Sequence, residues 1–210
     1  MSEGAHSPEY TRFLNSLAGA DVDSRESLDI EALLALGKEE RKNAEELLIE
    51  RIKEEDDWRA PPALAALRTK RAVRPMKARL GDAKGKMKIA LARALVELGA
   101  LDRIDETVIQ VLEEEDPDDG IAALAAADDL DSEPIVKALA RASVHHPGPE
   151  VRINAGAALL VMAKLDDDPL AWKFRPLYLQ LGEEDEKVRR EAFAEICKLT
   201  QIPPALADRA

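Results

Sequence analysis

The residues best suited to chemistry form an acidic run, EEEDPDDG, from Glu113 to Gly120. Dense carboxylates are the ligands that calcium prefers, and an EF-hand loop places oxygen ligands at positions 1, 3 and 5, Gly at 6 and Glu at 12. With Gly120 as position 6, position 3 falls on Pro117 and position 12 on Ala126, and neither side chain can bind a cation. The run therefore does not predict a calcium site. Two interpretations remain open: an acidic turn that stabilises the N-terminus of the next helix, and an electronegative docking site for a partner.

The histidines and the cysteine do not supply a catalytic or metal-binding set. His6 lies near the N-terminus, and His145 and His146 are adjacent before Pro147, where we expect a solvated turn; no Cys or His stands at ligand spacing from them. Cys197 is the only cysteine, cannot form an intramolecular disulfide, and is expected to be a buried structural thiol. A Gly-rich phosphate loop, a nucleophile elbow and an HExxH motif are all missing from the sequence. We therefore expect a protein that is not an enzyme and binds no metal or cofactor.

Composition favours a helical protein with a real core. The 210 residues are 46% hydrophobic but only 3% aromatic, with many Ala and Leu residues, which form helices readily and let them approach closely. The N-terminus lacks the basic start and apolar run of a secretory signal, and no stretch reaches the roughly 18 uncharged apolar residues of a membrane span. These features predict a cytoplasmic protein that does not enter a membrane.

Charge is distributed unevenly along the chain. The net charge of −12 argues against non-specific binding to nucleic acid. Eleven basic and three acidic residues lie between Arg68 and Arg103, whereas twelve acidic residues and no basic one lie between Asp105 and Glu133. The basic block is open to two interpretations: a solvated face that pairs with the acidic repeat beside it, or a site for an anion or an acidic partner.

Two segments of the sequence repeat one another. Setting EVRINAGAALLVM over KVRREAFAEICKL aligns Val151 with Val188, Arg152 with Arg189, Ala155 with Ala192, and Leu159 with Ile196. Apolar or small residues then recur at i, i+4 and i+8, on one face of a helix. The same frame fits KMKIALARALVEL from Met87, and weaker copies start at Trp58 and Asp119. The anchors are 29 to 37 residues apart, a period that is typical of helical solenoids.

Each anchor follows a short acidic or Gly/Pro-containing turn and, before that turn, another amphipathic segment. These segments predict helices over 38–53, 72–80, 104–114, 133–144 and 170–181. The pattern predicts an all-α fold, a right-handed α-solenoid of about five helix pairs over residues 38–202, with a tail at 203–210. Residues 1–37 are expected to cap the open N-terminal end with a helix that starts at Ser7 and Pro8.

The repeat resembles HEAT repeats of the short bacterial type, also called phycobilisome-lyase-type repeats, over about residues 38 to 200. Asp185, Val188 and Arg189 match the D-x-x-V-R pattern of that family fully, and Val151 with Arg152 match it with Gly148 in the acidic place. The copies near residues 58 and 119 depart from the pattern. The resemblance implies stacked helix pairs in which neighbouring pairs supply one another's core.

Solenoids use an extended concave surface to bind other proteins, and we therefore expect a non-catalytic protein-binding module. The residues expected to bind the partner lie near the starts of the second helices: Trp58, Arg59, Lys88, Glu113, Asp116, Asp118, Asp119, Arg152, Asn154 and Arg189. The Val-Arg arginines have a structural alternative, because they can pair with acidic turns of the next repeat. Trp58 has one too, as a filler of the core or of the space between repeats.

The lead-in segment, DIEALLAL to DDWRAPPALAAL, is similar to that of immunity proteins that neutralise bacterial toxins. That resemblance implies a protein partner such as a basic toxin domain, and a monomer or a 1:1 heterodimer. An acidic face from Glu113 to Glu133 would steer such a partner into place. The alternatives are an adaptor in a regulatory complex, including chaperone-like roles similar to those of phycobilin lyase subunits, and a HEAT-like DNA glycosylase. The net charge and the lack of aromatic residues in the basic block disfavour the glycosylase.

Overall fold

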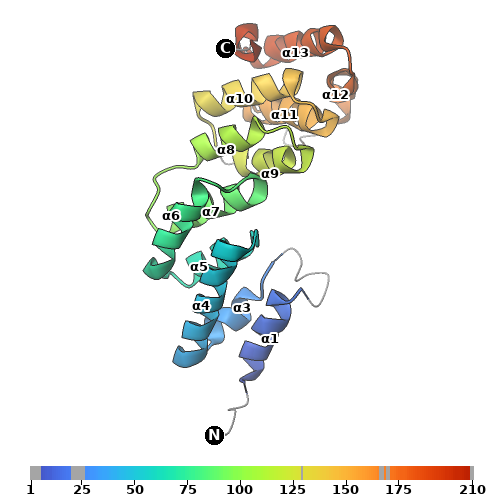
Figure 1. The fold of residues 1–210 in the computed structure, drawn as a ribbon. Coiled ribbons are helices and arrows are strands. Elements are labelled where there is room, and N and C mark those ends of the chain that lie inside the picture. The colour runs from blue at the N-terminus through green and yellow to red at the C-terminus, as the bar shows by residue number, and fades with distance from the viewer. Residues whose placement is uncertain (1–5, 20–26, 129, 166–167, 169–170, 209–210) are drawn as a thin grey trace, which may run out of the picture. The chain divides into compact units, whose positions relative to one another are not determined.

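A computed structural model describes residues 6–19, 27–128, 130–165, 168 and 171–208. All regular secondary structure in these ranges is helical, which confirms the all-α prediction (Figure 1). The chain divides into two compact units, unit 1 with residues 1–83 and 90–104, and unit 2 with residues 84–89 and 105–210. The division falls inside helix α7 (Gly85–Glu97).

Unit 1 is built around a long helix, α4. Its elements are α1 (Pro8–Leu17), α3 (Ile30–Ala35), α4 (Lys38–Glu54), α5 (Ala60–Ala66), the 3-10 helix η1 (Lys70–Ala72), α6 (Val73–Leu80) and the second part of α7. Helix α4 packs on α3, α5 and α6, and α1 packs on α3. The side chains of Phe13, Leu33, Leu48, Ile52 and Leu64 are fully buried and form the core. The predicted cap at residues 1–37 therefore belongs to the same unit as α4 and α5.

The start of α1 follows the sequence closely. The Ser7 hydroxyl accepts a hydrogen bond from the Tyr10 backbone N–H at 3.0 Å, and Pro8 occupies the first helical position. The Glu40 carboxylate in turn accepts from the Ser7 backbone N–H at 2.8 Å and from its hydroxyl at 2.7 Å. The predicted Ser cap is thus confirmed, and it also fastens α1 to α4.

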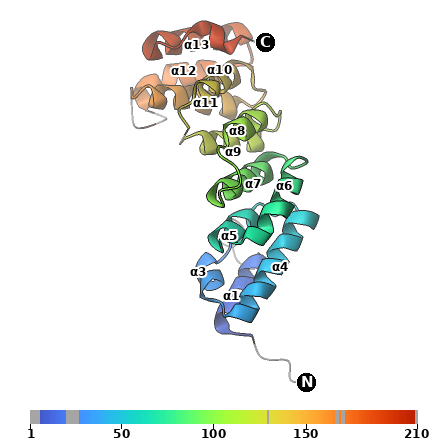
Figure 2. The same cartoon turned by 90° about the vertical axis from the view of Figure 1, so that its left-hand side faces the viewer.

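Unit 2 contains three successive helix pairs. Its elements are the start of α7, α8 (Asp105–Leu112), α9 (Pro117–Ala127), α10 (Glu133–His145), α11 (Pro149–Met162), the 3-10 helix η2 (Trp172–Phe174), α12 (Arg175–Gly182), α13 (Glu186–Thr200) and the 3-10 helix η3 (Pro204–Ala207). The pairs lie one upon another in chain order in both views of the ribbon (Figures 1 and 2). Helix α8 packs on α10, and α9 packs on α11. The first helices of these two pairs thus contact each other, and so do the second helices.

The last pair departs from this order. Helix α12 packs on α11 rather than on α10, while α13 packs on both α10 and α11. The 3-10 helix η3 then covers α10 and α13 as well, and Ala207 within it is buried. The segment predicted as a tail is therefore part of the packed structure of unit 2 up to Asp208. The right-handed solenoid remains a prediction.

Four of the five predicted first helices lie where the sequence places them, at α4, α6, α8 and α10. The prediction of one helix over 170–181 is wrong, because the described part of it is η2 followed by α12. Pro176 explains the break: a proline within the first turn of a helix is accommodated, but further inside its ring would clash with the carbonyl four residues earlier. Residue 170 lies outside the described ranges.

None of the helices in the part of the chain that the structure describes is both long enough and apolar enough to cross a membrane.

Candidate functional site

Three turns of unit 2 adjoin along one edge: those that precede α9, α11 and α13. Pro117 at the start of α9 lies against Gly148, where an added Cβ would meet the proline Cβ at 3.0 Å. Arg152 on α11 links the α10–α11 turn to the α12–α13 turn through hydrogen bonds. The three turns are therefore held to one another by side chains of α10, α11 and α13.

His146 joins the first two turns. Its imidazole is buried, and its Nε2 lies 3.0 Å from the backbone oxygen of Glu114, while the Gly148 backbone N–H donates to Nδ1 at 3.0 Å. Because a carbonyl can only accept and an N–H can only donate, this is the neutral tautomer with its hydrogen on Nε2. Burial is the main cause that lowers the pKa of His146. The expected solvated turn is thus wrong for this residue.

Acidification is expected to weaken unit 2 through His146. The folded-state pKa of His146 lies below its ordinary value of about 6.5, so the stability it contributes is complete above that value and is lost as pH falls below it. Urea unfolding at about pH 7.5 and about pH 5.5 measures this loss, which is at most about 1.4 kcal/mol per pH unit. The variant His146→Gln cannot be protonated there and should lose that part of the pH dependence. Equal pH dependence in the two proteins would contradict the assignment.

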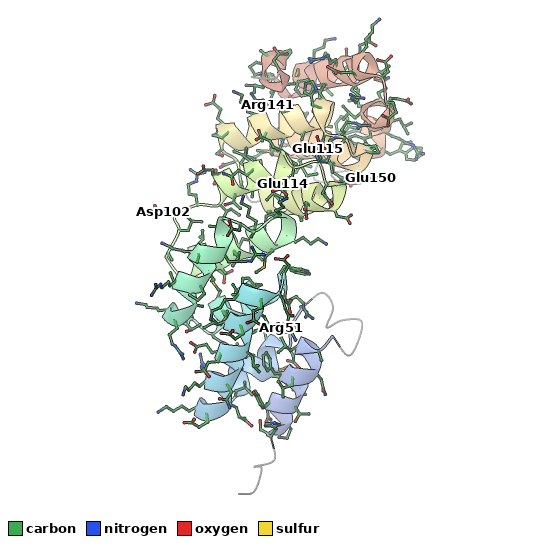
Figure 3. The ribbon with its side chains drawn as sticks, in the orientation of Figure 1. Arg51, Asp102, Glu114, Glu115, Arg141 and Glu150 are labelled. Atoms are coloured by element: carbon green, nitrogen blue, oxygen red, sulfur yellow. The ribbon has the colours of Figure 1, made fainter. Side chains whose placement is uncertain are left out.

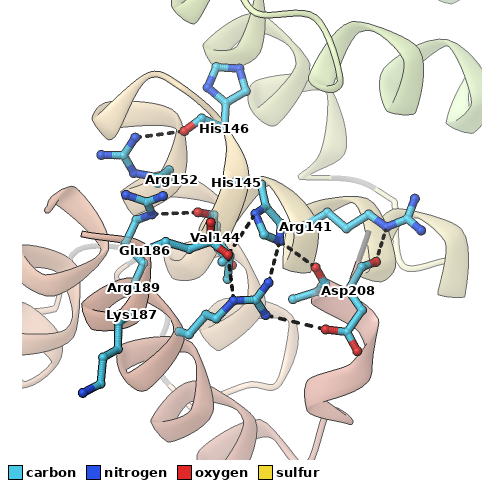
Figure 4. Close-up of polar contacts among 12 residues, drawn as sticks. Arg141, Val144, His145, His146, Arg152, Glu186, Lys187, Arg189 and Asp208 are labelled. Atoms are coloured by element: carbon cyan, nitrogen blue, oxygen red, sulfur yellow. Dashed lines mark hydrogen bonds and ion pairs between the residues drawn. The ribbon is translucent and has the colours of Figure 1, made fainter. Parts of the chain in front are cut away.

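Arg152 connects the second and third turns, and Figure 4 shows its contact with His146 in the second. Its side chain is 2% exposed, and every guanidinium nitrogen donates to a backbone carbonyl. The acceptors and distances are Leu181 at 2.8 Å from Nε, His146 at 2.9 Å and Pro147 at 2.8 Å from Nη1, and Gly182 at 2.8 Å and Glu183 at 3.2 Å from Nη2. Burial, followed by the charge of Arg189, lowers the pKa of Arg152, but an arginine remains protonated at neutral pH.

Arg189 repeats this arrangement one pair later. Its Nε donates to the Val144 oxygen at 2.7 Å, and its Nη1 donates to the oxygens of Glu183 at 2.9 Å and Glu184 at 2.6 Å. The sequence suggests that the Val-Arg arginines can pair with acidic turns of the next repeat. The geometry fits this alternative in a modified form, because the arginines bind mainly the backbone carbonyls of those turns. Arg152 fits this alternative best, because its guanidinium is buried with all its nitrogens engaged, and its assignment to partner binding stays a prediction.

Carboxylates line the outside of the same turns. We define the acidic edge as Glu113, Glu115, Asp116, Asp118, Glu150, Glu183, Glu184 and Asp185, all of which are exposed. Two of them have weak ion pairs, Glu113 with Arg141 at 3.8 Å and Glu184 with Arg152 at 3.9 Å. Among the described residues, no cation lies within 4.0 Å of Glu115, Asp118 or Glu150. Figure 3 labels Glu115 before α9 and Glu150 at the start of α11. The result is a strip of negative potential on a fixed backbone.

Two of the predicted acidic residues also have structural roles. The Asp116 carboxylate accepts from the backbone N–H groups of Asp118 at 2.9 Å and Asp119 at 3.3 Å, and so caps α9. Asp119 is only partly exposed, and its carboxylate lies against Gly85, where an added Cβ would be 1.7 Å from Oδ1. Gly85 has a φ of +46°, and the start of α7 needs glycine for both reasons. The acidic turn that stabilises the next helix is thus seen at Asp116, while a docking site for a partner stays a prediction.

The other predicted site residues lie elsewhere. Asn154 lines an apolar groove of about 450 Å³ between α9, α10 and α11, and Lys88 is partly buried on α7. Trp58 is partly buried in unit 1, and Arg59 beside it donates to the Ser16 and Leu17 carbonyls and pairs with Asp57 at 2.8 Å. Arg59 thus ties the start of α5 to α1.

The basic block is partly neutralised inside unit 1 rather than only by an acidic repeat. Arg71 pairs with Glu45 at 3.4 Å and with Glu46 at 3.5 Å on α4, and Arg79 pairs with Asp56. Among the cations of the block outside these pairs, three stand at helical spacing on η1 and α6, and we call Lys70, Arg74 and Lys77 the basic stripe. All three are exposed, with no carboxylate within 4.0 Å in the described part of the chain. A groove of about 450 Å³ beside the stripe is lined by Lys53, Arg74, Pro75, Ala78, Arg79 and Asp82.

Comparison of this chain with protein-family models, with curated proteins and with solved structures finds no match in any of the three. Function therefore has to be argued from the geometry of the chain itself.

The groups that could carry chemistry are few. The described ranges contain no cluster of three or more His, Cys, Asp or Glu side chains placed to hold a metal ion. Cys197 is buried, as predicted, and burial raises the pKa of its thiol to about 11, so it remains protonated at neutral pH. The acidic edge is consequently the feature of unit 2 that best fits a functional surface.

Sequence reasoning missed His146 and Trp172. His146 lies in a His-Pro-Gly turn, and a turn next to proline is usually solvated, so only the contact with Glu114 across 32 residues reveals its burial. Trp172 is 76% exposed although Ala171 before it and Phe174 after it are buried. It lies in η2, which the periodic pattern alone does not indicate.

Proposed function

We propose that this chain is a non-catalytic protein-binding module that docks a basic partner protein on the acidic edge. The observation that carries the proposal is the set of exposed, unpaired carboxylates Glu115, Asp118 and Glu150 on turns that His146 and Arg152 hold together. A rigid acidic strip accelerates the encounter with a basic surface, and it binds without first having to become ordered.

In its most specific form, the proposal is that the chain is an immunity protein that neutralises a basic toxin domain in a 1:1 complex. A domain that acts on nucleic acid has a cationic cleft, and an acidic strip can occupy that cleft in place of the phosphates. The similarity of the lead-in segment to immunity proteins points to the same class. The role needs no catalytic group.

The test uses two variants with the same change in net charge. The edge variant carries Glu115→Lys, Asp118→Lys and Glu150→Lys, which spare the cap at Asp116 and the contact of Asp119 with Gly85. The control variant carries Glu39→Lys, Glu54→Lys and Glu191→Lys, at exposed carboxylates outside the edge. Lysate of the source organism is passed over the unmodified chain and both variants in parallel, and bound proteins are identified by mass spectrometry.

The proposal predicts one abundant basic protein that the unmodified chain and the control variant retain and the edge variant loses. With that protein purified, the edge variant should associate with it at least about tenfold more slowly than the unmodified chain does at low salt. The difference between the two association rates should become smaller as the salt concentration rises. Association at the same rate as the unmodified chain would refute docking on the acidic edge.

One observation favours the adaptor role as a second candidate. Unit 1 carries the basic stripe while unit 2 carries the acidic edge, and two surfaces of opposite charge suit two different partners. An adaptor would retain several proteins, and Arg74→Glu with Lys77→Glu would release a different subset from the one released by the edge variant. A single retained partner, insensitive to the stripe, would rule this role out.

A further inference from the structure

Helix α12 has two unlike faces. Phe174, Tyr178 and Leu181 recur at i, i+4 and i+7 and are buried against the rest of unit 2. The opposite face carries Trp172 just before the helix and Leu179 within it. These two side chains are 76% and 60% exposed, the highest values among the large hydrophobic residues that the structure describes. An exposed Trp and Leu on one short face are typical of a binding surface.

Charged residues lie at the two ends of this face. Arg175 stands at the first position of α12 with its guanidinium 4.4 Å from the centre of the Trp172 ring, and Glu183 stands at the C-cap. In the ranges the structure covers, no carboxylate lies within 4.0 Å of Arg175 and no cation within 4.0 Å of the Glu183 carboxylate. Eight residues of helix separate them by about 12 Å, so they cannot pair with each other.

The order of these charges does not stabilise α12 itself. A helix favours anions at its N-terminus and cations at its C-terminus, and here Arg175 and Glu183 occupy the opposite positions. The order would be favourable against a second α12 that runs antiparallel, because the cation at each start then meets the carboxylate at the other end. The face is thus complementary to itself.

We propose that α12 is a self-association surface, on which a second copy of this chain packs its own α12 antiparallel about a two-fold axis. In this register Leu179 lies at the two-fold axis and packs on its counterpart, each Arg175 pairs with Glu183 of the second copy, and each Trp172 covers the far end of the other α12. Such an interface is isologous, since the same patch serves both subunits.

The proposed dimer uses one residue of the acidic edge, Glu183, and leaves free the three carboxylates that carry the proposed partner site. A basic partner would meet the cation of Arg175 on this face, so the charge order favours a second copy over that partner. Glu115, Asp118 and Glu150 take no part in the dimer. Because α12 is only eight residues long, the interface is small, and we expect a dissociation constant on the order of 10 to 100 µM.

Analytical ultracentrifugation of the full chain over a concentration series tests the proposal. The mass of the unmodified chain should rise from 23.0 kDa toward twice that value as concentration increases. Leu179→Glu should remain at the lower mass. Leu199→Glu, at a 45% exposed Leu on α13, is the matched control and should still dimerise. Circular dichroism of each variant establishes that it remains folded.

Charge exchange then tests the antiparallel order. Arg175→Glu alone and Glu183→Arg alone should each weaken dimerisation at least about tenfold, because both pairs become like-charged. A one-to-one mixture of these two variants, or the double variant, should recover dimerisation to within about threefold of the unmodified chain. A chain that stays monomeric over the series, a dimer that survives Leu179→Glu, or single exchanges without rescue would each overturn the proposal.

Discussion

Replacing Arg152 by Ala is expected to lower the free energy of unfolding of unit 2 by about 3 to 5 kcal/mol. The guanidinium supplies donors to five carbonyls in two turns, in a site that is 2% exposed. Removing it leaves carbonyls without a partner where water enters poorly, and each unsatisfied group costs about 1 to 3 kcal/mol. It also opens a cavity the size of its aliphatic stem, and the two turns lose the side chain that joins them.

Conservative replacements separate the causes of this loss. Arg152→Met keeps most of the volume but none of the donors, and should destabilise nearly as much as Ala if the hydrogen bonds dominate. Arg152→Lys supplies three donors from a single point and cannot reach both turns, so an intermediate loss is expected. Urea unfolding is followed by fluorescence in a Trp58→Phe background, where Trp172 in unit 2 is the only tryptophan.

Arg190→Ala serves as the control for Arg152→Ala. Arg190 is exposed; it pairs with Glu186 at 2.8 Å and with Asp208 at 3.6 Å and lies 3.4 Å from His145 Nε2, and such surface contacts contribute little in water. Arg190→Ala should therefore lower the free energy of unfolding far less than Arg152→Ala does. Equal effects of the two substitutions would show that the buried contacts do not hold the turns.

Gly156→Leu is expected to destabilise unit 2 by about 2 to 4 kcal/mol. A Cβ at this position of α11 would lie 2.4 Å from Leu181 Cδ1 and 3.2 Å from Ile196 Cδ1. A Cβ at the shorter distance cannot be accommodated unless the end of the buried Leu181 side chain shifts, so a large residue at 156 must displace side chains of α12 and α13. Gly156→Ala should cost less, because alanine offsets part of the overlap with a helix propensity higher by about 1 kcal/mol.

A double variant identifies the cause. Leu181→Ala removes the side chain that the new residue would strike, so Gly156→Leu with Leu181→Ala should be more stable than the sum of the single effects predicts, by at least about 1 kcal/mol. Thermal or urea unfolding measures all four proteins. Gly81, which has nothing within 4 Å of an added Cβ, provides the control, and Gly81→Leu should be tolerated. Additive effects at 156 and 181 would contradict the close approach.

The helix pairs of unit 2 could be predicted because their information is local. Val151, Ala155 and Leu159 repeat at 188, 192 and 196, and all six side chains are buried or partly buried in the structure. A period of four along a helix is set by neighbouring residues alone. For the same reason, the observed bounds of α8, α10 and α13 agree with the turns that the sequence predicts before and after these helices.

What could not be predicted depends on contacts between distant residues. The burial of His146 rests on the carbonyl of Glu114, and the burial of Arg152 rests on carbonyls around residue 182. A Val-Arg pair looks the same in sequence whether the arginine reaches a turn or a partner. The division of the chain inside α7 also follows from tertiary contacts, since the sequence of that helix is continuous and regular.

The acidic run illustrates how one pattern holds several roles. Asp116 and Asp119 serve α9 and α7, while Glu115 and Asp118 face outward. All four are carboxylates within five positions of the sequence, so residue type alone does not distinguish their roles. Only the direction of each side chain, set by its place in the helical turn, separates the structural residues from those available to a partner.

The guanidinium contacts of Arg152 and Arg189 have a consequence for how this surface can change over evolution. Nearly all of their acceptors are main-chain oxygens, which every amino acid provides, so the exposed side chains at 147, 183 and 184 do not have to be conserved to keep the turns in place. Mutation can alter the charge and shape of the edge at those sites with little penalty in folding. The surface of such a scaffold can change together with that of a partner, while the two arginines hold the backbone of the turns in place.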